Sequence, residues 1–179
     1  IHSSVSGTVI AIEPMLHPNG IKVNTIVIQN DGKDRLHESV VPKGDLNNLT
    51  PKQIIEIVRE AGIVGMGGAG FPTHIKLSPP PDKKIEYVII NGAECEPYLT
   101  SDHRVMLETP EDVIFGLKAI MKIFGLNRGY IGVEENKKDA IEVLKEYASK
   151  EQGIEIITLK TKYPQGAEKQ LIKVITGRE

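Results

Sequence analysis

The chain has 179 residues, of which 40% are hydrophobic and 26% charged, so it can bury a core and does not have the composition of a disordered protein. Its 22 Lys and Arg residues nearly balance its 24 Asp and Glu residues, and the net charge of −2 argues against nucleic-acid binding through bulk positive charge. The single cysteine, Cys95, excludes an intrachain disulfide and cannot by itself hold an iron–sulfur cluster. No apolar run approaches the roughly 20 residues that a membrane span needs.

Residues 1–45 are predicted to form β-structure. Apolar and polar or small residues alternate over 5–12 and over 22–29, and the turn-forming Pro18, Asn19 and Gly20 lie between these runs. Two or three strands cannot close a domain alone, so we expect part of a small barrel or sandwich. The segment holds no cluster of titratable groups, which favours a structural module without chemistry of its own.

Residues 46–179 are predicted to form an α/β domain in which helices and strands alternate. A capping-box sequence begins at Thr50 with proline at the first helical position, and Gly62 ends this helix. The elements expected after it are a strand at 87–90, a helix from 110 to 125, a strand at 130–133, a helix over 137–150, a strand at 154–159 and a closing helix from Glu168. Such alternation predicts a Rossmann-like, mixed or parallel sheet with flanking helices. Because the chain starts at Ile1 and ends close to a helical pattern, we expect a C-terminally truncated piece of a larger protein.

Four glycines occupy six positions between Gly65 and Gly70. They match the dinucleotide-binding spelling G-x-G-x-x-G, but here the glycines follow a helix instead of a strand, and Pro72 lacks the amide that a helix start would direct at a phosphate. Phe71 stands where the phosphate loop of nucleotide triphosphatases requires lysine. Two interpretations remain: the glycine backbone binds a flat or anionic ligand, or the glycines form a structural hinge. The nearby Lys76 favours a ligand with phosphate.

Polar residues gather after the predicted strand at 87–90, where an α/β sheet has its ligand crevice. They are Asn91, Glu94, Glu96 and, slightly further on, Asp102. Alternate residues of an extended chain point to the same side, so we expect Glu94 and Glu96 to face the crevice together. Solvated loop charges are the alternative, and a metal site ranks lower because the five histidines are scattered.

The glycine stretch and the carboxylate segment together resemble a known family. Residues 65–76 resemble the flavin loop of the NADH-binding flavoprotein subunit of respiratory complex I, residues 91–97 its N-A-D-E-x-E-P motif, and residues 163–169, less closely, its Y-x-x-G-E-E-T motif. The residues of these motifs are most similar to those of the C subunit of the Rnf electron-transport complex. Residues 2–9 resemble the barrel-sandwich module that precedes the flavin domain, so the resemblance covers nearly the whole chain.

This resemblance implies an NAD(H)-dependent flavin oxidoreductase that binds FMN noncovalently and passes electrons between nicotinamide and 4Fe-4S clusters, the latter outside this chain. Carried over by position, the FMN-binding residues would be Gly65, Gly67, Gly68, Ala69, Gly70, Lys76, Asn91, Glu94, Gly166 and Glu168. Phe71 and Glu96 would face NAD(H). No protein acid or base and no metal ligand is expected, because hydride transfer depends on stacking and distance.

The resemblance also implies partners and a location. The expected partners are the other subunits of a membrane-bound electron-transport complex and, indirectly, ferredoxin; no nucleic-acid partner is expected. The expected location is a peripheral position on the cytoplasmic side of the membrane. Two departures from the family pattern, Met66 for arginine and Ala93 for aspartate, remove expected polar contacts. They keep two alternatives open: a related flavin reductase, such as the electron-transfer component of a cobalamin or proline reductase, and a scaffold that keeps the fold without the cofactor.

Overall fold

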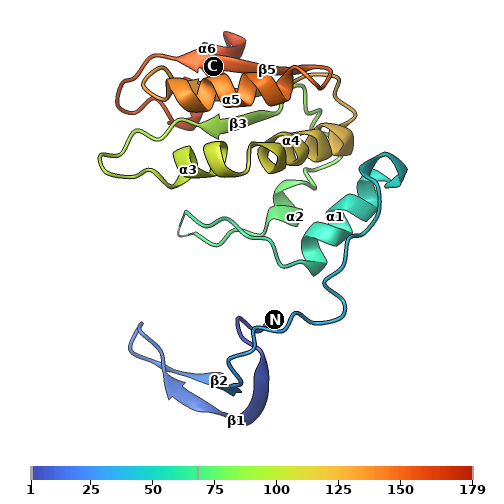
Figure 1. The fold of residues 1–179 in the computed structure, drawn as a ribbon, viewed down its shortest axis with the longest axis vertical. Coiled ribbons are helices and arrows are strands. Elements are labelled where there is room, and N and C mark those ends of the chain that lie inside the picture. Colours follow the sequence, from blue (N-terminus) through green and yellow to red (C-terminus); the bar gives the residue numbers. More distant parts are fainter. Residues whose placement is uncertain (1, 68, 179) are drawn as a thin grey trace. The chain divides into compact units, whose positions relative to one another are not determined.

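The computed structural model describes residues 2–67 and 69–178, and its chain divides into two compact units, Ile1–Gly44 and Asp45–Glu179. Each unit is described by itself below and is drawn in Figure 1. Within the described ranges, no helix has the length and apolar character needed to cross a bilayer.

The first unit contains one antiparallel hairpin, coloured blue in Figure 1. β1 (Gly7–Leu16) pairs with β2 (Lys22–Asn30), from Gly7 opposite Asn30 to Leu16 opposite Lys22, with a register shift between Val9 and Ala11. The turn between the strands is closed by the amide of His17, which donates to the carbonyl of Ile21 at 2.9 Å. β2 lies where the alternating pattern predicted it, whereas β1 begins two residues later than the pattern over 5–12 and extends four residues beyond it.

The second unit is built on a three-stranded parallel sheet in the order β3-β4-β5. Its strands are β3 (Ile89–Gly92), β4 (Gly129–Glu134) and β5 (Ile154–Leu159). The central strand β4 is buried at all positions but one, because it has a strand on each side and helices on both faces. The predicted parallel sheet is confirmed, although β3 begins two residues later than the apolar run at 87–90 indicated.

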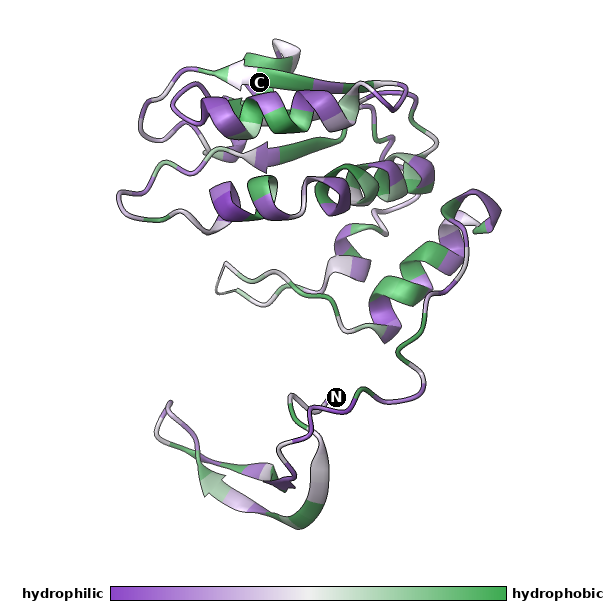
Figure 2. Cartoon of the chain, in the orientation of Figure 1, coloured by the Kyte–Doolittle hydropathy of each residue, from purple (hydrophilic) through white to green (hydrophobic). Residues whose placement is uncertain are grey.

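Two sets of helices cover the two faces of this sheet. Side chains alternate along β4, and the Cβ position of Gly129 faces Leu117 of α4 (Pro110–Phe124) whereas that of Gly132 faces Leu171 of α6 (Glu168–Thr176). Ile131 and Val133 share a core cluster with residues of α4 and α5 (Lys138–Ala148). Helices α4 and α5 therefore pack on one face and α6 on the other, and Figure 2 shows α4 and α5 carrying both hydrophobic and hydrophilic stretches.

The segment before the sheet contains the predicted first helix, α1 (Pro51–Glu60). Its capping box is present: Thr50 accepts from the amide of Gln53, and the Gln53 side chain accepts from the amide of Thr50. A short 3-10 turn, η1 (Leu46–Asn48), precedes it and is held by Lys122 of α4, whose Nζ donates to two of its carbonyls at 2.7 Å. The one-turn helix α2 (Thr73–Lys76) follows the glycine stretch and packs near α1.

The structure contains a helix that the sequence analysis did not predict, α3 (Ser101–Glu108). Thr109, the residue before α4, makes no side-chain cap for this helix; its hydroxyl donates to the carbonyl of Val105 at 3.3 Å, in the last turn of α3. The end of α4 is as predicted, because Gly125 adopts the left-handed conformation that terminates a helix.

Candidate functional site

The carboxyl ends of the three parallel strands bring three polar segments to one edge of the sheet. These segments are residues 91–96, which include the end of β3, residues 134–137, which begin with the last residue of β4, and residues 160–167 between β5 and α6. Parallel strands all end at the same edge, so residues more than 70 positions apart in the chain can meet there.

Asn91 connects the first segment with the third. Its Nδ2 donates to the carbonyl oxygen of Gly166 at 2.9 Å, and its Oδ1 accepts from the amide of Ala93 at 3.2 Å. The amide of Gly166 in turn contacts Cys95 Sγ at 3.4 Å. A Cβ at Gly166 would lie 3.1 Å from the carbonyl oxygen of Ala93, so the close approach of the two segments favours glycine here. The structure thus places two of the predicted site residues, Asn91 and Gly166, in direct contact.

Glu94 is buried, with 9% of its surface exposed, and its carboxylate lies at the beginning of α3. It accepts from the amide of Asp102 at 3.0 Å, from the amide of His103 at 3.3 Å and from Ser101 Oγ at 3.3 Å. A carboxylate in this place satisfies amides that a helix start leaves without partners and lies at the positive end of the helix dipole. Glu94 therefore acts as the cap that Thr100, next to the helix, does not provide.

The expectation that Glu94 and Glu96 face the same way is wrong. Glu94 turns inward to α3, whereas Glu96 is exposed and starts a turn in which its carbonyl accepts from the amide of Leu99 at 3.3 Å. The segment is bent at this point and does not continue the strand, so the two-residue period of an extended chain does not apply.

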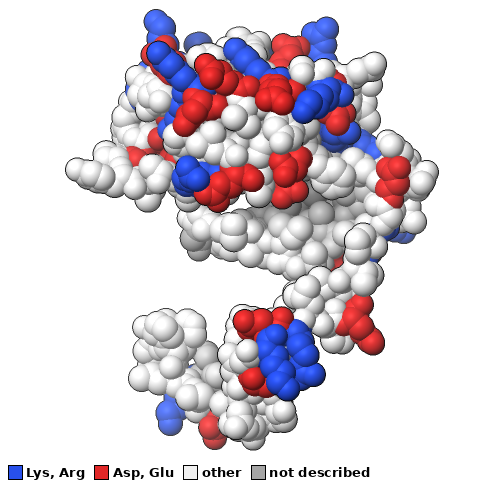
Figure 3. Space-filling view, in the orientation of Figure 1, with Lys and Arg blue, Asp and Glu red and all other residues white. Residues whose placement is uncertain are grey.

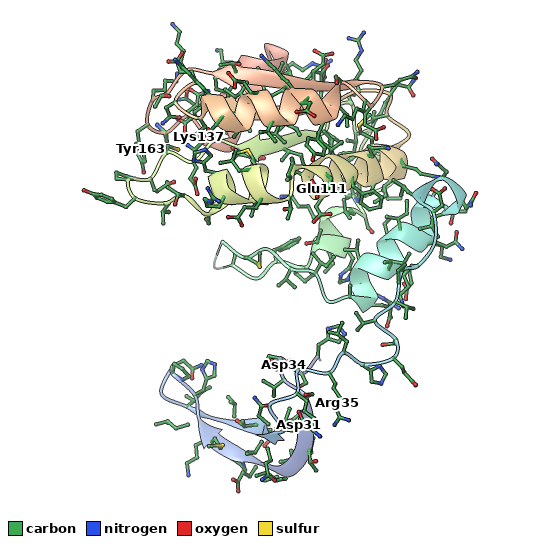
Figure 4. The ribbon with its side chains drawn as sticks, in the orientation of Figure 1. Asp31, Asp34, Arg35, Glu111, Lys137 and Tyr163 are labelled. Carbon is green, nitrogen blue, oxygen red and sulfur yellow. The ribbon has the colours of Figure 1, made fainter. Side chains whose placement is uncertain are left out.

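A buried ion pair that the sequence analysis missed lies beneath the same segment. Glu134, the last residue of β4, is 1% exposed, and its Oε2 lies 3.4 Å from the Nζ of Lys137, whose place Figure 4 marks. Oε2 also accepts from the amide of Glu94 at 3.2 Å, and Lys137 Nζ donates to the carbonyl of Glu94 at 3.2 Å. In sequence, a glutamate and a lysine three residues apart are indistinguishable from an exposed pair, so no sequence signal identified them.

Two buried polar side chains at this edge retain atoms without hydrogen-bond partners. They are Gln165, whose amide oxygen and nitrogen are both unpaired, and Glu134, whose Oε1 is unpaired. Gln165 is 1% exposed and directly precedes Gly166. Buried polar atoms are normally paired, so the strand-end segments hold hydrogen-bonding capacity that the chain's described residues do not use.

The ionisable groups around Glu94 influence one another. The pKa of Asp102 is raised from its ordinary value, first by loss of solvent and second by the negative charge of Glu94, while Lys137 acts in the opposite direction. Asp102 also lies in the first turn of α3. Groups with perturbed pKa values occur often at functional sites, although structural ion pairs perturb them too.

The glycine stretch forms a separate, open loop. Val64 and Pro72 form an isolated antiparallel bridge. The amide of Gly65 donates to the carbonyl of Phe71 at 2.9 Å, and the amide of Thr73 donates to the carbonyl of Ile63 at 3.1 Å. A Cβ added at Gly67 would meet nothing within 4 Å. The predicted residue Gly68 lies outside the described residues.

The other predicted residues of this loop are accessible. Ala69, Gly70, Phe71 and Lys76 are all exposed, and Gly70 has a φ of +61°, a conformation that glycine adopts without strain. Met66 is 96% exposed. In Figure 3, the visible surface of this unit is white over the region where Figure 1 draws the loop, so uncharged residues form it. None of the hydrogen bonds or ion pairs found among the described residues connects the loop with Asn91, Glu94 or Gly166.

Comparison with known proteins gives the chain a family context. A family model described as the Nuo51 FMN-binding domain matches residues 58–179, and a model described as the RnfC barrel sandwich hybrid domain matches residues 1–33. The resemblance found in the sequence motifs is therefore confirmed, as is the expected barrel-sandwich-like character of the N-terminal segment.

The curated relatives are subunits of oxidoreductase complexes. The chain is 53% identical to the C subunit of the Na(+)-translocating ferredoxin:NAD(+) oxidoreductase complex of Acetobacterium woodii, and the match covers 100% of this chain and 40% of the relative. It is 50% identical to the proton-translocating counterpart of Clostridium ljungdahlii, with 100% and 39% covered. The chain thus spans about two fifths of the length of these relatives.

A solved structure shows the same fold. The NAD+-reducing [NiFe]-hydrogenase in its H2-reduced state matches 78% of this chain and 27% of its own chain, with a TM-score of 0.63 and 22% identity.

Proposed function

Because the chain belongs to the Nuo51 FMN-binding domain family, we propose that it binds FMN and NAD(H) and serves a ferredoxin:NAD oxidoreductase of the Rnf type. In this role it passes electrons between nicotinamide and 4Fe-4S clusters that are outside this chain. Its partners are then the other subunits of an ion-translocating complex, and ferredoxin indirectly. It sits at the cytoplasmic side of the membrane through those partners.

The openness of the glycine loop is the observation that carries the proposal. Apart from its chain neighbours, no atom of the described residues lies within 4 Å of the Cβ position of Gly67, which leaves space at this point of the loop for a planar ring. The exposed Lys76 follows nine residues later and supplies a cation for a phosphate. The described residues therefore fit FMN: Gly65, Gly67 and Gly70 would approach it with backbone free of side chains, and Ala69 would add only a methyl group. Gly68, which lies outside the described residues, belongs to the same proposed set.

FMN, when bound, would supply the hydride-transfer and single-electron chemistry. The chain's own residues bind and orient. Lys76 places positive charge by the loop, and the hydrogen bond between Asn91 and Gly166 holds two strand-end segments together. The buried Gln165 directly before Gly166 has an amide group without a hydrogen-bond partner among the described residues.

Glu94, Glu96, Phe71 and Glu168 complete the proposed site. The carboxylate of Glu94 is already bound to amides of α3, so the segment around Glu94 lines the proposed site through its main chain. Phe71 is 53% exposed and offers a ring face to NAD(H), with Glu96 exposed for its hydroxyl groups. Glu168, the first residue of α6, closes the site beside Gly166.

A scaffold that keeps the fold without FMN is the second candidate. The engagement of Glu94 with α3 favours it, because a carboxylate with three donors has less capacity for a cofactor. Met66 and Ala93, which stand where the family pattern has arginine and aspartate, favour it as well.

Titration of the purified protein with FMN, followed by quenching of flavin fluorescence, separates the two. We expect saturable quenching, a roughly tenfold weaker affinity for Lys76→Ala through loss of a charged hydrogen bond, and an unchanged melting temperature. Lys52→Ala, at another exposed lysine of the same unit, is the matched control and should bind like the parent. Anaerobic addition of NADH should then bleach the flavin absorbance. Absence of quenching by a protein that circular dichroism shows to be folded would favour the scaffold.

A further inference from the structure

The geometry points to Glu134 and Lys137 as a pair of positioning residues that clamp the main chain at Glu94 and thereby set the strand-end half of the FMN site. This inference rests on the proposed function, which assigns neither residue a role.

The pair holds Glu94 from both sides of its backbone. Glu134 Oε2 accepts from the Glu94 amide at 3.2 Å, and Lys137 Nζ donates to the Glu94 carbonyl at 3.2 Å. The 3.4 Å contact between Lys137 Nζ and Glu134 Oε2 joins the two holding groups. The backbone amide and the backbone carbonyl of Glu94 are thus both held by one ion pair, which lies at the end of the neighbouring strand β4.

The clamp is rigid because it is buried. Side-chain exposure is 7% for Lys137 and 1% for Glu134, so solvent screens the pair weakly. Burial of two charges is costly and does not by itself indicate a gain in stability over an apolar pair of similar volume. A cost of this kind at the ligand-binding edge of a parallel sheet is consistent with a positioning role.

The clamped segment carries groups assigned to the site. Ala93 directly precedes Glu94 and gives its amide to Asn91, whose Nδ2 reaches Gly166. Cys95 directly follows and accepts the Gly166 amide. Rotation of the peptide groups on either side of Glu94 would therefore displace Asn91 and Gly166 together. Among the hydrogen bonds of the described residues, those of the Glu134 and Lys137 side chains reach no predicted site residue other than Glu94, so the pair acts through Glu94.

Cys95 provides a reporter that needs no flavin. It is the only cysteine in the chain, it is partly buried, and its sulfur takes part in the contact that the clamp maintains. Its rate of reaction with a small disulfide reagent under native conditions measures how well the segment is held.

The main test is the double variant Glu134→Gln/Lys137→Met, which removes both charges and so avoids leaving one buried alone. We expect Cys95 to react roughly tenfold faster and FMN to bind roughly tenfold more weakly, as expected when a charged hydrogen bond is lost. The matched control is Glu146→Gln/Lys150→Met, because that pair has the same 3.4 Å separation at the other end of α5 but is exposed. It should change neither quantity more than about twofold, in line with the small contribution of exposed pairs.

Glu134→Gln alone is the second variant and covers the case in which the double variant does not fold. Its amide oxygen can still accept from the Glu94 amide, so we expect both quantities to lie nearer the parent values. An unchanged Cys95 rate in the folded double variant overturns the clamp. If the double variant is unfolded, Glu134→Ala, which removes the acceptor for the Glu94 amide, is compared with Glu134→Gln, and equal Cys95 rates in these two variants overturn the clamp. A faster Cys95 reaction with unchanged FMN affinity overturns its link to the site. If the parent protein binds no FMN, the proposed function fails, and the Cys95 rate alone decides whether the pair positions the segment.

Discussion

Asn91 and Gly166 are joined across the edge of the sheet, with Nδ2 of Asn91 donating to the carbonyl oxygen of Gly166 at 2.9 Å over a separation of 75 residues. Through this bond Asn91 holds the turn before α6 against the segment after β3. The same side chain accepts from the amide of Ala93, so both ends of its amide group are used. Substitution of Asn91 alone therefore removes the side-chain hydrogen bond that joins these two strand-end segments.

We expect Asn91→Ala to lower the free energy of unfolding by about 1 kcal/mol, because two hydrogen bonds at an exposed position are lost. FMN affinity should fall in the same variant. Asn91→Asp is the control, since it keeps the acceptor for Ala93 but loses the donor to Gly166. Urea denaturation measures the stability, and an effect of Asn91→Asp as small as the error would show that the link to Gly166 contributes nothing.

Gly67→Ala should leave the melting temperature unchanged and weaken FMN binding. Apart from the chain neighbours of Gly67, the added methyl meets no atom of the described residues within 4 Å, so the fold has no reason to respond, whereas a ring lying on the loop would meet it. Gly116→Ala in α4 is the matched control: its Cβ position is also free, and it should raise stability by roughly 0.5–1 kcal/mol with no effect on FMN. Equal FMN affinity in Gly67→Ala and the parent would show that FMN does not bind against this loop.

The sequence predicted those parts of the fold that local chemistry determines. The capping box at Thr50 begins α1, left-handed Gly125 ends α4, and the apolar runs of β4 and β5 lie within a residue of their predicted positions. Alternation of these elements was enough to predict a parallel sheet and hence the edge where its site lies.

The sequence could not predict features that depend on distant residues. α3 was missed because Glu94, seven or more residues before the groups it contacts, supplies the cap in place of a neighbouring side chain. The inward turn of Glu94 and the burial of Glu134 and Lys137 arise from tertiary packing. A charge run is usually exposed, so the sequence offers no way to identify the buried members.

The raised pKa of Asp102 predicts a pH-dependent gain in stability for Asp102→Asn. Loss of solvent and the charge of Glu94 disfavour the ionised form in the folded state, so the folded pKa exceeds the unfolded one. The ionised carboxylate therefore lowers stability once the pH rises through the folded pKa, and this cost is absent below the ordinary pKa of 3.8. Asp102→Asn should exceed the parent in stability at pH 7 and match it near pH 3, as measured by urea denaturation. A gain of equal size at both pH values would show that titration is not the cause.

Asp31 in the first unit should titrate at unusually low pH. Hydrogen bonds from Ser6 Oγ, from the amide of Lys33 and from Arg35 lower its pKa from 3.8 to about 2, and Figure 4 shows Asp31 and Arg35 near one another. Because the folded pKa is depressed, the ionised group stabilises this unit above pH 3.8, and the contribution is lost as the pH falls through about 2. Ser6→Ala removes the largest of these effects, so the Asp31 pKa should move back toward 3.8, whereas Ser4→Ala should leave it near 2. Titration of the Asp31 carboxyl carbon by NMR measures both, and a pKa near 3.8 in the parent protein would show that the contact between Ser6 and Asp31 does not persist in solution.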